Sequence, residues 1–154
     1  MSSDFESARS RSHGDLDRPD FVAALKASGA LQFGTFTLAS GKTSSYYVDI
    51  KKAITRPDLL RTIAKAIAPY ARGASRIAGV ELGELNRGDL VLFVEDVVTT
   101  GGTLRGAIDR LREHGAVVED CVCVVDREEG GAILLAEIGV RLHALLRASE
   151  LTGS

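Results

Sequence analysis

The sequence has few of the residues on which many common catalytic and metal sites depend. Its 154 residues include no tryptophan, two cysteines and three histidines. Cys121 and Cys123 stand two apart in an apolar segment, so on a strand both would lie on one face. Without other ligands nearby they are interpreted as small buried residues rather than as a metal or redox pair. No histidine, His143 included, has a carboxylate partner in sequence that would indicate a catalytic dyad.

Long hydrophobic runs and a strong excess of one charge are also missing. No apolar segment approaches the roughly 18 residues that span a bilayer, and the N-terminus lacks the apolar core of a signal peptide. We therefore expect no membrane partner and a cytoplasmic location. The net charge of −2 gives no basic footprint for nucleic acid. With 45% hydrophobic and 26% charged residues, the composition is that of a globular domain.

The chain divides into a short leader and one domain. Residues 1–17 are rich in Ser, Arg and Asp and are predicted to be a disordered leader, whereas 18–154 are predicted to form a single domain. Its strands and helices alternate, which favours a mostly parallel sheet. The expected elements are a helix at Pro19–Ser28, a hairpin within Leu31–Ile50, a helix from Pro57 to Gly73, strands at Ile77–Leu82, Val91–Val94, Val117–Val125 and Arg141–Leu146, and helices at Leu104–His114 and Ala132–Ile138.

The most informative segment is VLFVEDVVTTGGT, Val91 to Thr103. Its first four residues are consecutive, apolar and β-prone, as in a strand buried on both faces. Glu95 and Asp96 follow at the carboxyl edge, where open α/β sheets bind ligands. The expected turn, Thr99–Thr103, then opens into a helix. Its glycines allow close approach of backbone N–H groups, and the positive helix end favours a phosphate monoester.

The two acids complement this phosphate site. Carboxylates accept hydrogen bonds from vicinal hydroxyls and can help to hold a magnesium ion, so Glu95 and Asp96 next to the turn suit a ribose 5-phosphate. The plainer alternative is a strand, a helix cap and a tight turn with solvated acids. The segment has neither the spacing of a Walker A loop nor that of the dinucleotide fingerprint G-x-G-x-x-G.

This segment and three others carry a resemblance to a known family. The signature resembles the phosphoribosyl pyrophosphate motif of type I phosphoribosyltransferases, and the orotate phosphoribosyltransferases are the most similar group across residues 20–147. The other segments are LQFGTFTLASGKTSSYYVD (Leu31–Asp49), IAGVELG (Ile77–Gly83) and VVDREE (Val124–Glu129). The resemblance implies a Rossmann-like, mostly parallel α/β sheet with a small N-terminal hood. It also implies Mg²⁺ as cofactor, phosphoribosyl pyrophosphate and orotate as substrates, and a homodimer.

Roles for individual residues follow from the same resemblance. Glu95 and Asp96 are the candidate catalytic residues and hold the ribose hydroxyls, while no side chain is singled out as a direct metal ligand. Thr99 and Arg127 contact the pyrimidine and its carboxylate, and an arginine fork suits a carboxylate. Without the resemblance, the alternative for Arg127 is a solvated charge at a strand end, in the run DREE. The phosphate and ribose are contacted by Glu95, Asp96, Val97, Val98, Thr99, Thr100, Gly101, Gly102 and Thr103.

Two tyrosines of the hairpin are candidates for the base pocket. Tyr46 and Tyr47 are predicted to close the pyrimidine pocket by stacking, although strand aromatics are as readily core residues. Val80–Gly83 matches the pyrophosphate loop of the family. Ala39 stands where many relatives have lysine, so one cation is missing, and Lys42 and Lys51 are nearby charges more typical of the surface.

One connection is too short for the expected sheet. Only Gly83–Gly88 separates the strand that ends near Leu82 from the next one if that strand starts near Asp89, and six residues span at most about 20 Å, whereas a parallel crossover needs a dozen or more residues. Either this strand pair is antiparallel, or a segment between Gly83 and Glu84 has been lost. The family carries a helix, a strand with an Arg-Lys pair and a loop with Lys and His at this point. Those cations stabilise the departing pyrophosphate.

Three functional hypotheses remain. The first is an orotate phosphoribosyltransferase of pyrimidine biosynthesis, whose activity is reduced by the missing loop. The second is a non-catalytic module that binds phosphoribosyl groups or nucleotides and lacks the leaving-group machinery. The third, a phosphoribosyltransferase for another base, is disfavoured by the FGTFTLASGK and VVDREE segments.

Overall fold

The computed structural model describes residues 16–38, 40–79 and 85–152. All but the last two residues of the expected leader, together with Ala39 and the Val80–Gly83 loop, lie outside the described residues. In the described part of the chain, no helix is long and apolar enough to cross a membrane.

A four-stranded sheet forms the centre of the molecule. Its strands are adjacent in the order β3 (Arg76–Ala78), β4 (Leu90–Val98), β5 (Val117–Asp126) and β6 (Arg141–Arg147). Each neighbouring pair is parallel. The central strands consist of consecutive apolar, mostly β-branched residues, because both of their faces are covered. The predicted α/β fold with a mostly parallel sheet is therefore confirmed.

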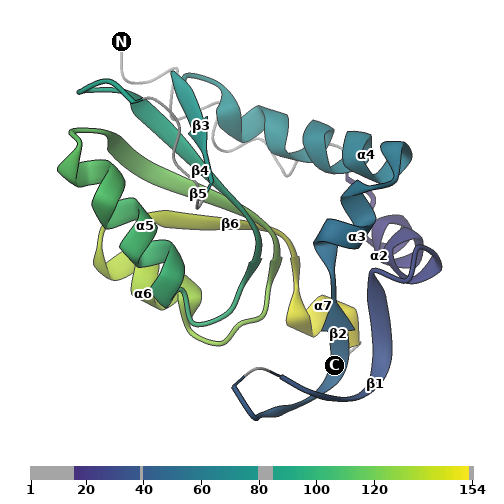
Figure 1. Cartoon of the computed structure of the whole chain (residues 1–154). Coiled ribbons are helices and arrows are strands. Elements are labelled where there is room, and N and C mark those ends of the chain that lie inside the picture. The colour runs from purple at the N-terminus through teal and green to yellow at the C-terminus, as the bar shows by residue number, and fades with distance from the viewer. Residues whose placement is uncertain (1–15, 39, 80–84, 153–154) are drawn as a thin grey trace.

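Helices cover both faces of this sheet. Helices α5 (Gly102–Glu113) and α6 (Gly131–Glu137) lie on one face, and α4 (Pro57–Ile67) lies on the other (Figure 1). Alternate residues of β4 enter the two cores: Val91 and Phe93 pack with α5, whereas Leu92 packs with α4. The sheet is thus the middle layer of three.

The two cysteines lie inside the core on the α5 side. Cys121 and Cys123 are fully buried and unpaired, and both pack in one cluster with Phe93 and Leu135. Burial raises the pKa of the Cys121 thiol to about 12 and also raises that of Cys123. Both thiols are therefore protonated at neutral pH, in agreement with their interpretation as small core residues.

The N-terminal segment forms the hood. Helix α2 (Arg18–Ala27) begins at Asp17, whose carboxylate accepts a hydrogen bond from the Asp20 N–H. The antiparallel hairpin of β1 (Leu31–Thr37) and β2 (Thr43–Val48) follows, and the short helix α3 (Ile50–Ile54), not foreseen from the sequence, leads into α4. The helix predicted to reach Gly73 ends at Ile67 and continues as a 3-10 turn, Ala68–Ala71, which contains Pro69.

The hood is joined to the C-terminal end of the chain. Helix α7 (Ala148–Thr152) follows β6 and lies beside the hood (Figure 1). Arg18 of α2 forms an ion pair with Glu150 of α7. Leu151 is buried in the same core cluster as Phe21 and Leu25 of α2. These contacts fix the hood over the carboxyl edge of the sheet.

The short connection joins two parallel strands. Strand β3 is parallel to β4, with Ala78 opposite Phe93, so the antiparallel alternative was wrong. The described part of β3 also ends at Ala78, short of the predicted Leu82. Asp89 holds the start of β4, because its carboxylate accepts hydrogen bonds from the Asn86 N–H at 2.9 Å and from Arg76 Nε at 3.2 Å. These hydrogen bonds lower the pKa of Asp89, and the bond from the Asn86 N–H has the largest effect.

Candidate active site

The acids of the signature lie inside β4 rather than after its end. Strand β4 continues through Val98, because Val97 and Val98 pair with Val125 and Asp126 of β5. The predicted end at Val94 was therefore wrong by four residues. Glu95 and Asp96 still lie among the last four residues of the strand, close to the carboxyl edge, and both are half-buried.

The threonine and glycine turn leads directly into α5. Gly101 has φ +81° and precedes the first helical residue, Gly102, so the helix begins two residues before the predicted Leu104. This left-handed conformation is open to glycine at little cost. Gly101 offers no side chain to cap the helix, so the first N–H groups of α5 have no side-chain acceptor there. Such groups at a positive helix end bind an anion well.

A second loop, between β5 and α6, packs against this turn. The Arg127 N–H donates to the Val98 carbonyl at 2.9 Å, and the Gly131 N–H donates to the Thr99 carbonyl at 3.1 Å. A Cβ at Gly131 would lie 2.4 Å from Val98 Cγ1 and 2.8 Å from the Thr99 carbonyl oxygen. The threonine and glycine turn therefore rests on a glycine that sequence reasoning did not single out, although the Gly-Gly pair after VVDREE was a visible signal.

Glu95 and Asp96 interact with the backbone beside them. Glu95 Oε1 accepts a hydrogen bond from the Asp96 N–H at 2.9 Å, and Asp96 Oδ1 accepts one from the Val97 N–H at 2.7 Å. Burial, followed by the neighbouring Asp96, raises the pKa of Glu95 to about 7, while Lys51 of α3 acts in the opposite direction. Glu95 is thus poised to lose its proton near neutral pH, and a cation or hydroxyl donor would favour that loss.

The raised pKa of Glu95 predicts a loss of stability as the pH rises. Between pH 4.5 and 7 the folded protein keeps the proton while the unfolded chain has lost it, so the free energy of unfolding falls through this window. The full shift corresponds to at most about 3 kcal/mol, and solvent screening of a half-exposed carboxyl reduces the expectation to about 1 kcal/mol. Urea denaturation at pH 4.5 and 8 should show Glu95→Gln gaining this amount relative to wild type. Parallel pH curves would contradict the prediction.

The side chain of Arg127 lies between the loop after β5 and the hood, largely shielded from solvent. Its side chain is 9% exposed, so the alternative of a solvated charge was wrong. Nε donates to Glu129 Oε1 at 2.9 Å, and Nη2 donates to Ser44 Oγ at 3.1 Å. The guanidinium also lies 4.7 Å from the centre of the Tyr46 ring. The loop after β5 is thereby joined to strand β2 of the hood.

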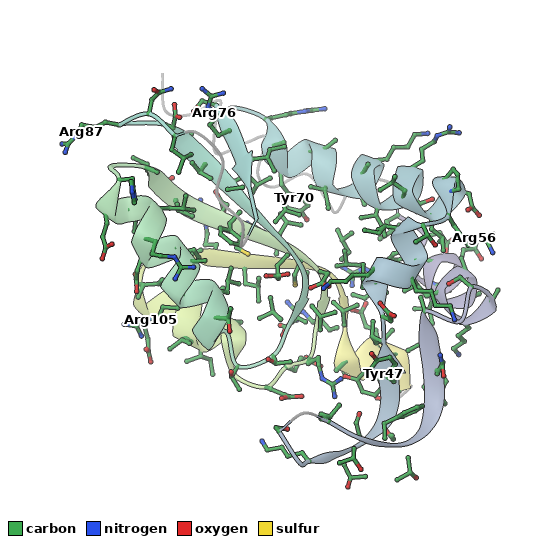
Figure 2. All side chains as sticks on the ribbon, viewed as in Figure 1. Tyr47, Arg56, Tyr70, Arg76, Arg87 and Arg105 are labelled. Carbon is green, nitrogen blue, oxygen red and sulfur yellow. The ribbon has the colours of Figure 1, made fainter. Side chains whose placement is uncertain are left out.

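The two candidate tyrosines face opposite sides of the hairpin. Tyr46 is buried against Arg127, whereas Tyr47 is 43% exposed and packs against Phe36 with ring centres 5.7 Å apart. Tyr47 lies on the hairpin of the hood (Figure 2). Because strand neighbours point to opposite faces, the structure brings Tyr46 to the site residues and does not bring Tyr47 there.

His143 has a carboxylate partner that the sequence did not reveal. Its Nε2 lies 2.8 Å from Asp120 Oδ1, and Arg141 Nε donates to the same oxygen at 3.0 Å. Tyr70, near the centre of Figure 2, stacks on His143 with ring centres 4.8 Å apart. Burial acts to raise the pKa of Asp120, but His143 and Arg141 outweigh it and lower the value. This cluster lies toward the amino ends of β5 and β6, where Asp120 pairs with Leu92, three residues before Glu95 on β4.

The comparisons with known proteins agree with this geometry. Residues 47–133 match the model of the phosphoribosyl transferase domain. The chain is 45% identical to the orotate phosphoribosyltransferase of Thermoplasma volcanium, with 82% of this chain and 96% of that protein covered. This chain belongs to the orotate phosphoribosyltransferase family. A second relative, from Methanosarcina acetivorans, is 38% identical over 89% of this chain and 92% of its own length.

Solved structures show the same fold. The orotate phosphoribosyltransferase of Aeropyrum pernix superposes with a TM-score of 0.71 at 28% identity, with 87% of this chain and 99% of that chain covered. The structure of Leishmania donovani UMP synthase gives a TM-score of 0.79 at 29% identity over 90% of this chain, which spans 38% of that longer protein.

The alignments contain many positions that have no counterpart in this chain. The match to the Thermoplasma volcanium enzyme has 160 positions, more than the whole chain of 154 residues, yet uses 82% of the chain, about 126 residues. About 34 of those positions therefore have no counterpart here. The Methanosarcina acetivorans match, 173 positions on 89% of the chain or about 137 residues, leaves about 36. This length suits the helix, strand and loop expected to be missing between Gly83 and Glu84.

Proposed function

We propose that the protein transfers a phosphoribosyl group from phosphoribosyl pyrophosphate to orotate, giving orotidine 5'-monophosphate in pyrimidine biosynthesis. The proposal places it in the cytoplasm, as a homodimer of one domain over residues 18–154, with Mg²⁺ as cofactor. The observation that carries it is that two half-sites lie at the same edge of the sheet: a phosphoribosyl half-site, Glu95 to Thr103, and a base half-site at Arg127. Glu95 and Asp96 stand beside an uncapped helix start, and the buried Arg127 lies across the same edge of the sheet.

Each half-site has a defined task. The N–H groups and hydroxyls of Thr99–Thr103 hold the 5'-phosphate, and the carboxylates of Glu95 and Asp96 accept hydrogen bonds from the ribose hydroxyls. As the bond to pyrophosphate breaks, positive charge develops on the ribose, and the nearby carboxylates stabilise it. Arg127 holds the orotate carboxylate, which orients the ring nitrogen toward the anomeric carbon.

The residues present fit a magnesium ion bound jointly with the substrate. The described residues contain no cluster of three metal-ligating side chains. Glu95 and Asp96 would hold the ion, because their carboxylates are the hard oxygen donors that Mg²⁺ prefers. When bound, the ion neutralises charge on the leaving pyrophosphate.

Formation of orotidine 5'-monophosphate with Mg²⁺ tests the proposal. Because the family cations between Gly83 and Glu84 are missing, we expect turnover below that of full-length relatives, with binding of phosphoribosyl pyrophosphate retained. Binding without any turnover would favour the alternative of a non-catalytic phosphoribosyl-binding module. If the amide resonances of Thr99–Thr103 do not move on titration with phosphoribosyl pyrophosphate and Mg²⁺, both hypotheses fail.

A substitution at Arg127 separates the two half-sites. Arg127→Lys keeps the charge but removes the fork, so we expect orotate affinity to fall about tenfold, the effect of losing one charge-assisted hydrogen bond. Affinity for phosphoribosyl pyrophosphate should stay within twofold, because that ligand is held by β4 and α5. Calorimetric titration with each ligand measures both values. An equal loss for both ligands would place Arg127 outside the base pocket.

A further inference from the structure

Ser44 is a buried polar residue to which the family resemblance gives no role. It is 8% exposed and lies on the face of β2 that it shares with Tyr46. Its hydroxyl donates to the Tyr46 carbonyl at 2.7 Å and accepts from Arg127 Nη2 at 3.1 Å. Each of these bonds uses a different part of the hydroxyl group, so its direction is fixed by the hood backbone.

Three contacts fix the plane of the Arg127 guanidinium. Glu129 accepts from Nε at 2.9 Å, and Ser44 accepts from Nη2. The Tyr46 ring lies 4.7 Å below, which prevents tilting. A planar group held at two nitrogens and on one face has little rotational freedom left. Nη1 makes no hydrogen bond to any residue in the described ranges, so its two N–H groups, beside the second N–H of Nη2, are left to meet a ligand.

The position of Glu129 limits how an anion can approach. A carboxylate can pair with a guanidinium along its Nε side or at the end formed by Nη1 and Nη2. Glu129 occupies the Nε side, and its charge offsets that of a guanidinium removed from water. An incoming carboxylate is thus confined to the Nη1 end.

We infer that Ser44 and Glu129 are positioning residues, which hold Arg127 so that Nη1 is presented to the substrate carboxylate. This inference rests on the proposed function, in which Arg127 receives orotate. It adds that base recognition requires the hood, because Ser44 reaches Arg127 across 83 sequence positions. If the hood moved away from the core, Arg127 would lose its contact with Ser44, and the arginine fork would no longer be aligned.

Ser44→Ala, compared with Ser45→Ala, tests the inference. Ser45 is the neighbouring residue on the exposed face of β2, so it is a matched control. We expect Ser44→Ala to weaken orotate binding about tenfold and to leave phosphoribosyl pyrophosphate binding within twofold. Ser45→Ala should change neither affinity. Ser44→Thr, which keeps the hydroxyl, should recover most of the loss, as should Glu129→Gln compared with Glu129→Ala.

The Nε–H resonance of Arg127 gives a reading that does not depend on substrate. Because Nε is buried and bonded to Glu129, we expect a sharp, slowly exchanging signal in wild type that Glu129→Ala broadens and Ser44→Ala shifts. If wild type binds no orotate, the proposed function fails while these signals still test the positioning of Arg127. Unchanged signals with unchanged orotate affinity would overturn the inference. So would an equal loss of affinity for both substrates, which indicates only a loosened hood.

Discussion

Asp96→Asn is expected to weaken binding of phosphoribosyl pyrophosphate with Mg²⁺ about a hundredfold. Two hydrogen bonds from ribose hydroxyls to a carboxylate contribute roughly 1.5 kcal/mol each, and 3 kcal/mol corresponds to about that ratio. The fold should persist, because the Asp96 carboxylate accepts a hydrogen bond from the Val97 N–H that an amide oxygen can also accept. Orotidine 5'-monophosphate formation should fall by at least the same factor.

Calorimetry and thermal unfolding of the same samples measure this expectation. Asp109→Asn is the matched control, since Asp109 is an exposed carboxylate on α5 whose closest cation, Arg105, lies 3.9 Å away. It should alter neither binding nor stability. If Asp96→Asn bound phosphoribosyl pyrophosphate with wild-type affinity, the proposed role of the Asp96 carboxylate in binding this substrate would be wrong.

The raised pKa of Glu95 adds a pH dependence to donor binding. Because the carboxylate form accepts the hydroxyls, affinity should increase as the pH rises from 6 to 8 through a pKa of about 7. Part of such a slope belongs to the phosphate of the ligand itself, whose second pKa is about 6. The difference between wild type and Glu95→Gln isolates the protein's share.

The signature could be predicted from sequence because its information is local. A run of apolar residues, two acids and a glycine turn occupy thirteen consecutive positions, and each part restricts the backbone by itself. A mostly parallel sheet also followed from the alternation of strands and helices. Within the signature, the end of the strand was misplaced, because Val97 and Val98 are as β-prone as the run before the acids and continue its pairing.

Contacts between distant segments could not be predicted in the same way. Arg127 meets Ser44 only because the hood folds back over the sheet, and nothing near VVDREE in the chain encodes that approach. The pairing of His143 with Asp120 depends on the register of β5 and β6. The resemblance supplied roles for single residues, but not the partners that hold them in place.

Gly131→Ala is expected to destabilise the fold by about 1–3 kcal/mol, the usual cost of forcing extra volume into a packed region. The added Cβ would lie 2.4 Å from Val98 Cγ1 and 2.8 Å from the Thr99 carbonyl oxygen. The valine methyl can move, but the carbonyl belongs to the backbone and accepts the Gly131 N–H. The turn proposed to hold the phosphate would therefore shift, so affinity for phosphoribosyl pyrophosphate should fall together with stability.

Gly106→Ala provides the control for this substitution. Gly106 lies inside α5, and a Cβ there would approach only Arg110 Nη1, at 3.7 Å. Replacing a helical glycine by alanine should stabilise the protein by about 0.5–1 kcal/mol without changing donor affinity. Urea denaturation and calorimetry of both variants give the comparison. If Gly131→Ala is as stable as wild type and the amide resonances of Thr99–Thr103 are unmoved, the close packing of the two loops does not control the phosphate site.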